Sequence, residues 1–187
     1  MDTPNSQSKT ALAHYQHWLA PVVKQMQALP YSGLALLARF SIAGVFWQSG
    51  QTKVQGFVMN LVTGDFQLGW PRLADGVIDL FETEYKLPLL PPALGAILAA
   101  FGEHAFPLLI LLGLATRFSA LALLSMTAVI QLLVYPGAYP THGVWASVLL
   151  LLMMQGPGKL SLDNWIASKP AEGTKSVASV REDEIQK

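Results

Sequence analysis

The sequence contains no cysteine and carries little charge. Of its 187 residues, only 13% are Asp, Glu, Lys or Arg, whereas a soluble globular protein has about 25%. The lack of cysteine excludes disulfides, thiol redox relays, cysteine-ligated iron–sulfur clusters and thiolate zinc sites. The net charge is zero, so nothing points to nucleic acid. Any redox chemistry must therefore use a cofactor, a quinone or a partner protein.

Hydrophobic residues make up 52% of the chain and are gathered in long runs. Four runs predict transmembrane helices, because about 20 apolar residues cross a bilayer at about 1.5 Å per residue. Their ranges are 31–50, 89–114, 118–135 and a shorter 141–155. The predicted fold class is therefore all-α, a four-transmembrane-helix bundle with additional amphipathic surface helices, in a membrane domain of residues 31–165.

Amphipathic segments flank these spans. Residues 1–30 are expected to be a polar tail followed by an interfacial helix, whose apolar stripe over 10–29 lies on the membrane or on a partner domain. The outer connection 51–88 is polar, but Pro71 opens a stretch in which five apolar residues share one helical face. These are Leu73, Val77, Leu80, Phe81 and Tyr85. Residues 166–187 are expected to be a disordered cytoplasmic tail.

The basic residues predict the orientation. No cleavable signal peptide is recognisable, so the first span is expected to act as an uncleaved membrane signal. Four spans place both termini and Arg117 on one side, which then holds most of the Lys and Arg residues. By the positive-inside rule this side is cytoplasmic. The prediction is a multi-pass protein of the bacterial inner membrane with both termini in the cytoplasm.

Two charged residues fall inside predicted spans, where each needs a partner or a purpose. Arg39 lies about 12 Å and Glu103 about 16 Å from the cytoplasmic ends of their helices. Their similar depth predicts a buried ion pair. His104 points to another face of its helix. The side chains expected near the same level are Ser125, Thr127, Ser147 and, further outward, Gln131.

Such a polar layer has two interpretations. It indicates a proton-accessible or ligand-binding cavity, or it only fixes the register of the helices. No metal site is expected. His14 and His17 form a surface pair that is more simply solvated, and His104 and His142 lie about 15–20 Å apart along the bundle, too far to share one haem. Phosphate-loop, dinucleotide and zinc motifs are absent from the sequence.

Three groups of residues resemble the DoxX family of small membrane proteins. The first is Arg39, Gly44, Phe46, Gly50 and Lys53. The second is Glu103 followed by LLILLGLATR, and the third is the run from Gly156 to Asp163, GPGKLSLD. The resemblance covers about residues 31–165. The long connection 51–88 and Pro107, which would bend its helix, depart from the family pattern.

The resemblance implies a compact four-helix membrane protein but leaves its function open. The family is named after a membrane subunit associated with quinol and sulfur-compound oxidation, and other members belong to complexes that handle oxidative or thiol stress. Distant eukaryotic relatives are assembly chaperones or cargo receptors without catalysis. Quinone is therefore the candidate cofactor, and the chain is expected to act as a subunit and not as an enzyme on its own.

The closing motif also has a direct physical interpretation. Gly156, Pro157 and Gly158 stop the last span, and Ser161 and Asp163 follow in a turn. Their side chains are expected to accept backbone N–H bonds or cap a short helix. Asp163 is also a candidate partner of Arg117. We favour a structural role for this motif, as a clasp between segments of the chain, over a catalytic site.

Two functions from different classes follow. In the first, the chain is a membrane subunit of a quinone-linked or redox-stress complex, with Arg39, Glu103 and His104 at a quinone-head or proton site. In the second, it is a non-enzymatic membrane adaptor or assembly chaperone that holds partners with its surface segments. A transporter is a weaker third, because four spans are few for an inverted repeat unless a homo-oligomer supplies it. The expected partners are the bilayer and a membrane-complex protein.

Overall fold

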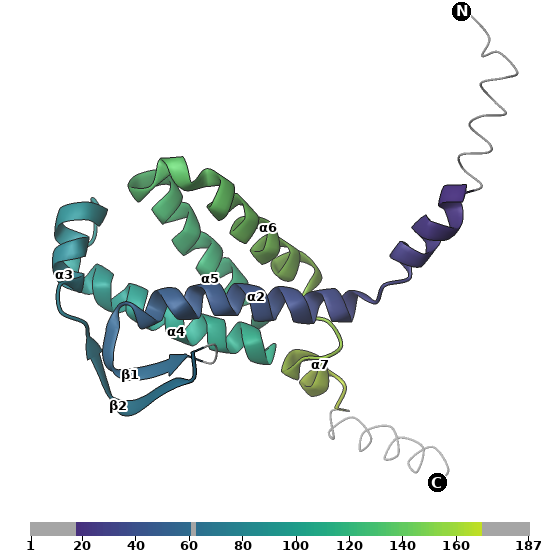
Figure 1. Cartoon of the computed structure of the whole chain (residues 1–187), viewed down its shortest axis with the longest axis horizontal. Coiled ribbons are helices and arrows are strands. Elements are labelled where there is room, and N and C mark those ends of the chain that lie inside the picture. The colour runs from purple at the N-terminus through teal and green to yellow at the C-terminus, as the bar shows by residue number, and fades with distance from the viewer. Residues whose placement is uncertain (1–17, 61–62, 170–187) are drawn as a thin grey trace, which may run out of the picture.

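The structure is a computed structural model that describes residues 18–60 and 63–169. Four long helices form its body (Figure 1): α2 (Tyr31–Gln51), α4 (Pro92–Leu112), α5 (Thr116–Val129) and α6 (Tyr139–Gln155). A π-helical turn η2 (Ile130–Val134) extends α5, and a 3-10 turn η3 (Pro136–Ala138) precedes α6. These helices are the elements that the four hydrophobic runs predict.

The four helices share one apolar core. Helix α2 packs against α4 and α6, and α5 packs against α4 and α6. Several buried core residues are alanines, which let helix backbones approach closely in a membrane protein. The buried cluster consists of Ala38, Ile42, Ala43, Phe46, Ile110, Ala120, Leu123, Leu149 and Leu152.

Three helical segments are long and apolar enough to cross a membrane. They are Pro92–Leu112, Thr116–Val134 and Pro136–Gln155. Helix α2 qualifies only together with the preceding helix Trp18–Gln27, from which it is bent by 62°. The chain is therefore a multi-pass membrane protein with three or four spanning segments. Pro107 lies inside α4 without interrupting it.

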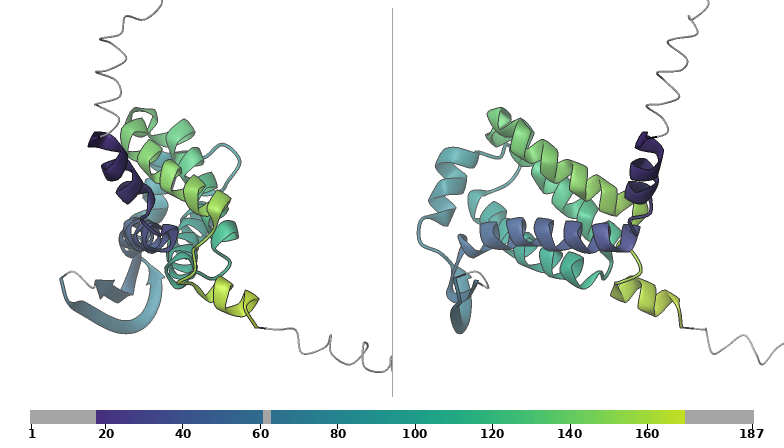
Figure 2. Two further views of the ribbon diagram at one scale, coloured as in Figure 1. Left: turned by 90° about the vertical axis from the view of Figure 1, so that its right-hand side faces the viewer. Right: turned by 45° about the vertical axis from the view of Figure 1, so that its right-hand side comes forward.

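The two ends of the helix body differ. At one end, named here the hairpin end, α2 passes into strands β1 (Val54–Asn60) and β2 (Asp65–Leu73) and then α3 (Val77–Leu80) with a π-helical turn η1 (Phe81–Tyr85). At the other, the tail end, α2 begins, α4 turns into α5, and α6 leads to α7 (Leu162–Ala167). Figure 2 shows the hairpin projecting sideways beyond the helices.

The connection between the first two predicted spans differs from its expectation. Strands β1 and β2 form an antiparallel hairpin, where only a polar connection and a helix opening at Pro71 were expected. Pro71 lies in β2, and the helix begins at Val77. Of the predicted apolar face, all members but Leu80 do pack together with Ala96 of α4: Leu73, Val77, Phe81 and Tyr85. This face is therefore used inside the molecule.

The structure describes only part of the helix predicted near the N-terminus and of the tail predicted at the C-terminus. The helix Trp18–Gln27 covers part of the predicted helix 10–29, and residues 10–17 lie outside the described residues, as do 1–9. Of the disordered tail predicted for 166–187, residues 166 and 167 are instead helical, because α7 continues to Ala167. Residues 170–187 lie outside the described residues.

Candidate functional site

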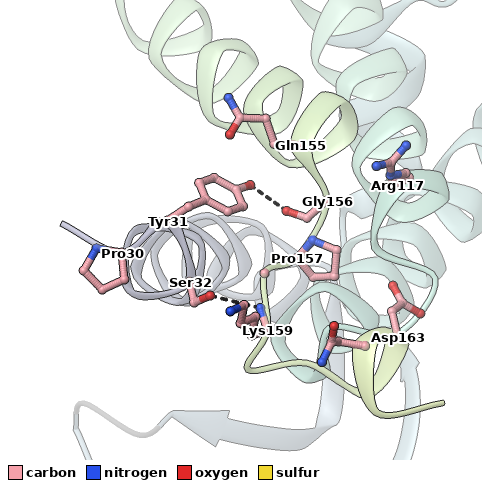
Figure 3. Close-up of a pocket in the computed structure, with 11 residues that line it drawn as sticks. Pro30, Tyr31, Ser32, Arg117, Gln155, Gly156, Pro157, Lys159 and Asp163 are labelled. Atoms are coloured by element: carbon pink, nitrogen blue, oxygen red, sulfur yellow. Dashed lines mark hydrogen bonds between the residues drawn. The ribbon is translucent and has the colours of Figure 1, made fainter. Parts of the chain in front are cut away.

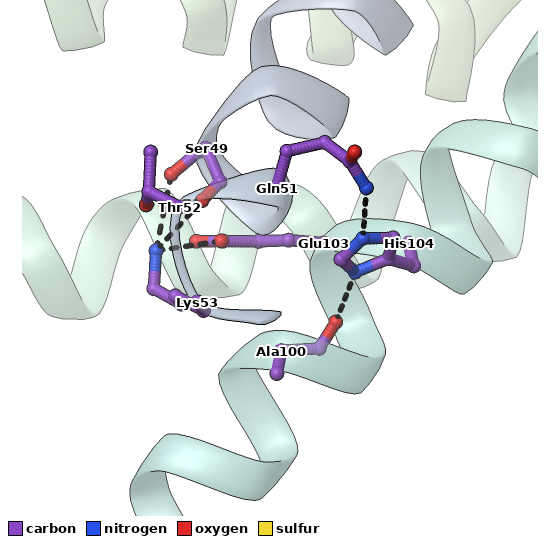
Figure 4. Close-up of polar contacts among 7 residues, drawn as sticks. All are labelled: Ser49, Gln51, Thr52, Lys53, Ala100, Glu103 and His104. Atoms are coloured by element: carbon purple, nitrogen blue, oxygen red, sulfur yellow. Dashed lines mark hydrogen bonds and ion pairs between the residues drawn. The ribbon is translucent and has the colours of Figure 1, made fainter. Parts of the chain in front are cut away.

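A buried ion pair joins Lys53 to Glu103 at the hairpin end (Figure 4). Lys53 Nζ lies 2.7 Å from Glu103 Oε2. The ammonium also donates to the backbone oxygen of Ser49 at 3.3 Å and to its hydroxyl at 3.2 Å. Lys53 is 4% and Glu103 2% exposed. Each of the three N–H groups of the ammonium thus has an oxygen acceptor. A buried charge needs such partners, because it has lost its contacts with water.

The end of α2 positions Lys53 for this contact. The N–H of Lys53 bonds to the carbonyl of Gly50 at 2.9 Å, which closes the last turn of the helix. The carbonyl of Lys53 accepts the N–H of Ala74 at 3.0 Å, which ties it to the end of β2. A Cβ on Gly50 would lie 2.8 Å from the His104 ring and 3.0 Å from the Glu103 carbonyl. Glycine therefore permits the close approach of α2 to α4.

His104 forms a second hydrogen-bonded unit beside the ion pair (Figure 4). Its Nδ1 lies 2.7 Å from the Ala100 carbonyl, so Nδ1 carries the hydrogen. Its Nε2 lies 2.8 Å from Gln51 Nε2 and accepts from that amide. Gln51 Oε1 in turn accepts the Met59 N–H at 2.8 Å. In this arrangement Nδ1 of His104 is the donor and Nε2 is the acceptor.

Trp47 completes the edge of the site. Its ring centroid lies 5.0 Å from that of His104 at an interplanar angle of 68°, and its indole N–H donates to the Met59 carbonyl at 2.8 Å. Trp47, Gln51 and His104 are all partly exposed. We call these three residues the rim. The rim is accessible, whereas the ion pair behind it is buried.

Tyr85 lies in the neighbouring π-helical turn η1, where the charge of the site affects its hydroxyl. Burial raises the pKa of the Tyr85 hydroxyl, and the negative charges of Glu103 and Glu84 raise it further. Its ring packs 4.5 Å from that of buried Phe81. Tyr85 therefore stays neutral at physiological pH.

The predicted ion pair between Arg39 and Glu103 is not formed. Arg39 lies at the tail end, where its guanidinium donates to the carbonyls of Leu111, at 3.3 Å, and Leu160. The depth argument assumed that the two helices end at one level. Instead, the end of α4 lies beside Arg39, eight residues into α2. Glu103 is consequently level with the far end of α2, where Lys53 follows.

The other members of the predicted polar layer make no hydrogen bond to Glu103 within the described residues. Three hydroxyls bond to carbonyls of their own helices, as Ser and Thr commonly do: Ser125 to Leu121, Thr127 to Leu123, and Ser147 to Gly143. Gln131 donates to the Pro136 carbonyl and contacts His142 Nδ1, each at 2.7 Å. Among the described residues, the hydrogen bonds of these four side chains do not connect them to one another.

The closing motif ties α7 to the start of α5 at the tail end. Ser161 caps α7 by accepting the Asn164 N–H at 3.2 Å. Asp163 accepts the N–H groups of Ala115 and Thr116 at 2.8 and 3.0 Å, at the start of α5. Both side chains thus occupy capping roles of the expected kind. The pair of Asp163 with Arg117 is not formed, because Lys53–Glu103 is the only salt bridge among the described residues.

A pocket of about 600 Å³ opens at the tail end (Figure 3). The Tyr31 hydroxyl donates to the Gly156 carbonyl at 2.6 Å, and the Lys159 N–H donates to Ser32 Oγ at 3.1 Å. The lining residues are 30–32, Arg117, 155–159, Asp163 and Asn164. Their bonds join the start of α2 to the end of α6. The pocket is separate from the Lys53–Glu103 site.

Sequence reasoning missed Lys53 and the rim residues Trp47 and Gln51. The available signal was position: Lys53 comes directly after a predicted span, so its four-carbon stem can reach back into the helix body. Within the described residues, no group of three or more His, Asp or Glu residues is arranged to hold a metal ion. The arrangement can bind and release a proton or donate hydrogen bonds to a carbonyl ligand.

Comparisons with known proteins identify relatives. The family model for DoxX matches residues 34–136, a range that contains Lys53, Glu103 and the rim. An uncharacterized protein of Haemophilus influenzae is 29% identical over 150 residues, which cover 76% of this chain and 89% of that protein. No solved structure matches the chain.

Proposed function

Because the chain belongs to the DoxX family, we propose that it is the membrane subunit of a quinone-linked redox complex. The observation that carries this proposal is the buried Lys53–Glu103 pair behind the rim. A charge pair inside a membrane protein is costly, so it marks a functional site by default. In this proposal Glu103 is the proton acceptor, and the rim receives the quinone headgroup.

The proposed membrane arrangement has four spans, α2 being the first. The tail end bears Arg117, Lys159 and Lys169, while the hairpin end carries the five acids of 51–88. The positive-inside rule then puts the tail end in the cytoplasm of a bacterial inner membrane, with both termini. The Lys53–Glu103 site would open toward the outer face of that membrane.

The residues fit a quinone headgroup at the rim better than at the ion pair. Lys53 and Glu103 are almost fully covered, so they leave a ring little access. Trp47 offers an aromatic face, and the Gln51 amide offers an N–H donor for a quinone oxygen. His104 Nε2 is the acceptor that a quinol hydroxyl needs. Binding would replace the Gln51–His104 hydrogen bond by bonds to the ligand.

The proposed quinol oxidation needs a partner protein that accepts the electrons. Oxidation of a quinol to a quinone releases two electrons and two protons. His104 Nε2 would accept one of these protons, and the Glu103 carboxylate would accept the other. The electrons pass to a redox-active partner subunit. The role of this chain is to bind the headgroup and carry protons away from it.

Quinone binding is testable through the rim tryptophan. The protein would be reconstituted in nanodiscs and titrated with a short-chain ubiquinone analogue while tryptophan emission is recorded. The proposal predicts saturable quenching that Trp47→Phe or Gln51→Ala removes. Trp165→Phe, at an exposed tail-end position, is the matched control and should retain it. Linear quenching that is identical in all four proteins would overturn the proposal.

The adaptor function remains the second candidate, supported by one observation. The helix Trp18–Gln27 exposes apolar side chains of its stripe: Val22 is 52% and Met26 66% exposed. Apolar side chains exposed in this way fit a partner helix. Under this reading Met26→Asp abolishes capture of a partner protein, whereas Gln25→Asp on the same helix does not. Equal capture by both variants would exclude this stripe as the adaptor surface.

A further inference from the structure

Residues 65–70 of strand β2 alternate between large apolar residues and polar or small residues. Phe66, Leu68 and Trp70 alternate with Asp65, Gln67 and Gly69. Side chains of a strand point alternately to opposite faces, so Phe66 and Leu68 lie on one face. Trp70 follows them where the register of the two strands shifts. Phe66, Leu68 and Trp70 are 59%, 79% and 90% exposed. On the β2 side, the hairpin thus presents apolar side chains that the rest of the described chain leaves exposed.

Strand β1 extends this face toward the helices. Phe57 pairs with Leu68, and Met59 pairs with Phe66, so these side chains join the same face. The ring of Phe57 packs edge-on against Trp47 of α2, with centroids 6.3 Å apart. The apolar face is therefore turned toward the helix body, and its β1 side is covered by α2. The β2 side extends beyond the helices (Figure 2).

The position of the hairpin at the end of the spans decides what covers β2. Trp47 lies in the last turns of α2, so the face that meets it lies beside the end of the helix body. The surface of α4 at the hairpin end is itself apolar, with Ile97 52%, Leu98 50% and Phe101 66% exposed. The hairpin face continues this lipid-facing surface at the level where the helices end.

We infer that the hairpin lies on the bilayer surface and inserts Phe66, Leu68 and Trp70 among the lipid headgroups. Aromatic residues, Trp above all, favour the boundary between headgroups and acyl chains. Asp65 and Gln67 on the opposite face remain in water, which is the division an interfacial segment requires. A two-stranded hairpin is marginally stable by itself in water, and the lipid contact supplies the apolar partner that it lacks.

The lack of cysteine makes the test clean. Single cysteines at Leu68, at Phe66 and, as the opposite-face control, at Gln67 each give one labelling site in an otherwise cysteine-free chain. Each variant, L68C, F66C and Q67C, is labelled with a polarity-sensitive fluorophore and reconstituted alone into phospholipid liposomes. The liposomes are prepared with and without lipids that carry a nitroxide in the upper acyl chain.

The expected result is a difference between the two faces. Labels at 66 and 68 should emit at shorter wavelength and be quenched by the nitroxide lipid, whereas the label at 67 should emit as in water and be quenched by aqueous iodide. Water-like emission from all three labels would overturn the inference and leave the face to a protein partner. Shielding that depends on protein density, without nitroxide quenching, would assign the face to a second copy and also overturn it.

Discussion

Lys53 and Glu103 lie 50 residues apart in sequence, yet their side chains meet at 2.7 Å. The contact joins the first residue beyond the capped end of α2 to the middle of α4, and both residues are almost fully buried. It closes the helix body at the hairpin end and places a charged pair directly behind His104. Several measurable consequences follow from this contact and from the opposite, tail end.

Breaking the ion pair from one side is expected to destabilise the protein strongly. Lys53→Met leaves the Glu103 carboxylate buried and unpaired, which costs about 3–5 kcal/mol. The double variant Lys53→Met with Glu103→Leu should recover much of this loss, because no charge remains without a partner. The measurement is the free energy of unfolding in mixed micelles titrated with denaturing detergent.

The control for this series is Glu82→Gln, which makes a similar change to an exposed acid at the same end. It should alter stability by no more than about 0.5 kcal/mol. If Lys53→Met is as stable as this control, the pair is not buried in the membrane-embedded protein, and the proton role of Glu103 loses its basis.

Gly113 and Gly143 should respond in opposite directions to the same substitution. Gly113 has φ +69°, and a Cβ there would collide with the Arg39 guanidinium and the Ser161 side chain. Gly113→Ala is therefore expected to lower stability by about 2 kcal/mol or more. Gly143 in α6 has no neighbour within 4 Å of an added Cβ, so Gly143→Ala should stabilise by up to about 1 kcal/mol. A similar effect of both would contradict the described packing around Gly113.

Asp163 is expected to matter as a cap. Asp163→Ala removes the acceptor of the Ala115 and Thr116 N–H groups and should cost about 1–2 kcal/mol. Asp163→Asn keeps one acceptor oxygen and should lose less. Thermal unfolding followed by circular dichroism would measure both, with the exposed Asp79→Asn as control. Full stability of Asp163→Ala would show that water replaces the cap.

Tyr135 gives a prediction about pH at the hairpin end. Its hydroxyl donates to the Glu84 carboxylate, and this hydrogen bond raises the pKa of Tyr135 to about 12 from the usual 10. The folded protein therefore holds the phenolic proton more tightly than the unfolded chain. The contribution of this bond is complete below pH 10 and is lost as pH rises from 10 to about 12.

The absorbance of tyrosinate at alkaline pH checks this prediction. Tyr135→Phe should remove the component that titrates near 12. Glu84→Gln should leave Tyr135 titrating closer to its usual value, while Glu82→Gln should not change it. An unchanged high-pH component in Glu84→Gln would mean that the carboxylate is not the cause of the shift.

The helices could be predicted from the sequence, whereas the contacts between them could not. Long apolar runs bounded by Pro and Gly predict where the helices lie. In a bilayer the backbone N–H and C=O groups must bond within the protein, and a helix satisfies them within one segment. The partner of Glu103 depends on how far one helix slides along another. The estimate for Arg39 assumed level helix ends, whereas the end of α4 lies beside Arg39, eight residues into α2, and Glu103 therefore meets Lys53.

The hairpin could not be predicted from the sequence for a different reason. The alternation from Asp65 to Trp70 is a strand pattern, but Gly69 and Pro71 within it and the acidic residues around it resemble a polar connection. Only the pairing with Val54–Asn60 makes it a hairpin. Those pairings also place Met59 against Gln51 and Trp47, so the rim of the site could not be expected before the hairpin was known.

The most direct measurement of the proposed function is purification from membranes in mild detergent, followed by mass spectrometry of both the bound small molecules and the associated proteins. The redox-subunit account predicts that quinone and an oxidoreductase subunit co-purify with the wild type and with Glu82→Gln, and that Trp47→Phe and Gln51→Ala lose the quinone but keep the protein partner. A preparation without quinone or oxidoreductase, accompanied instead by exported or assembling proteins, would contradict this account and support the adaptor function.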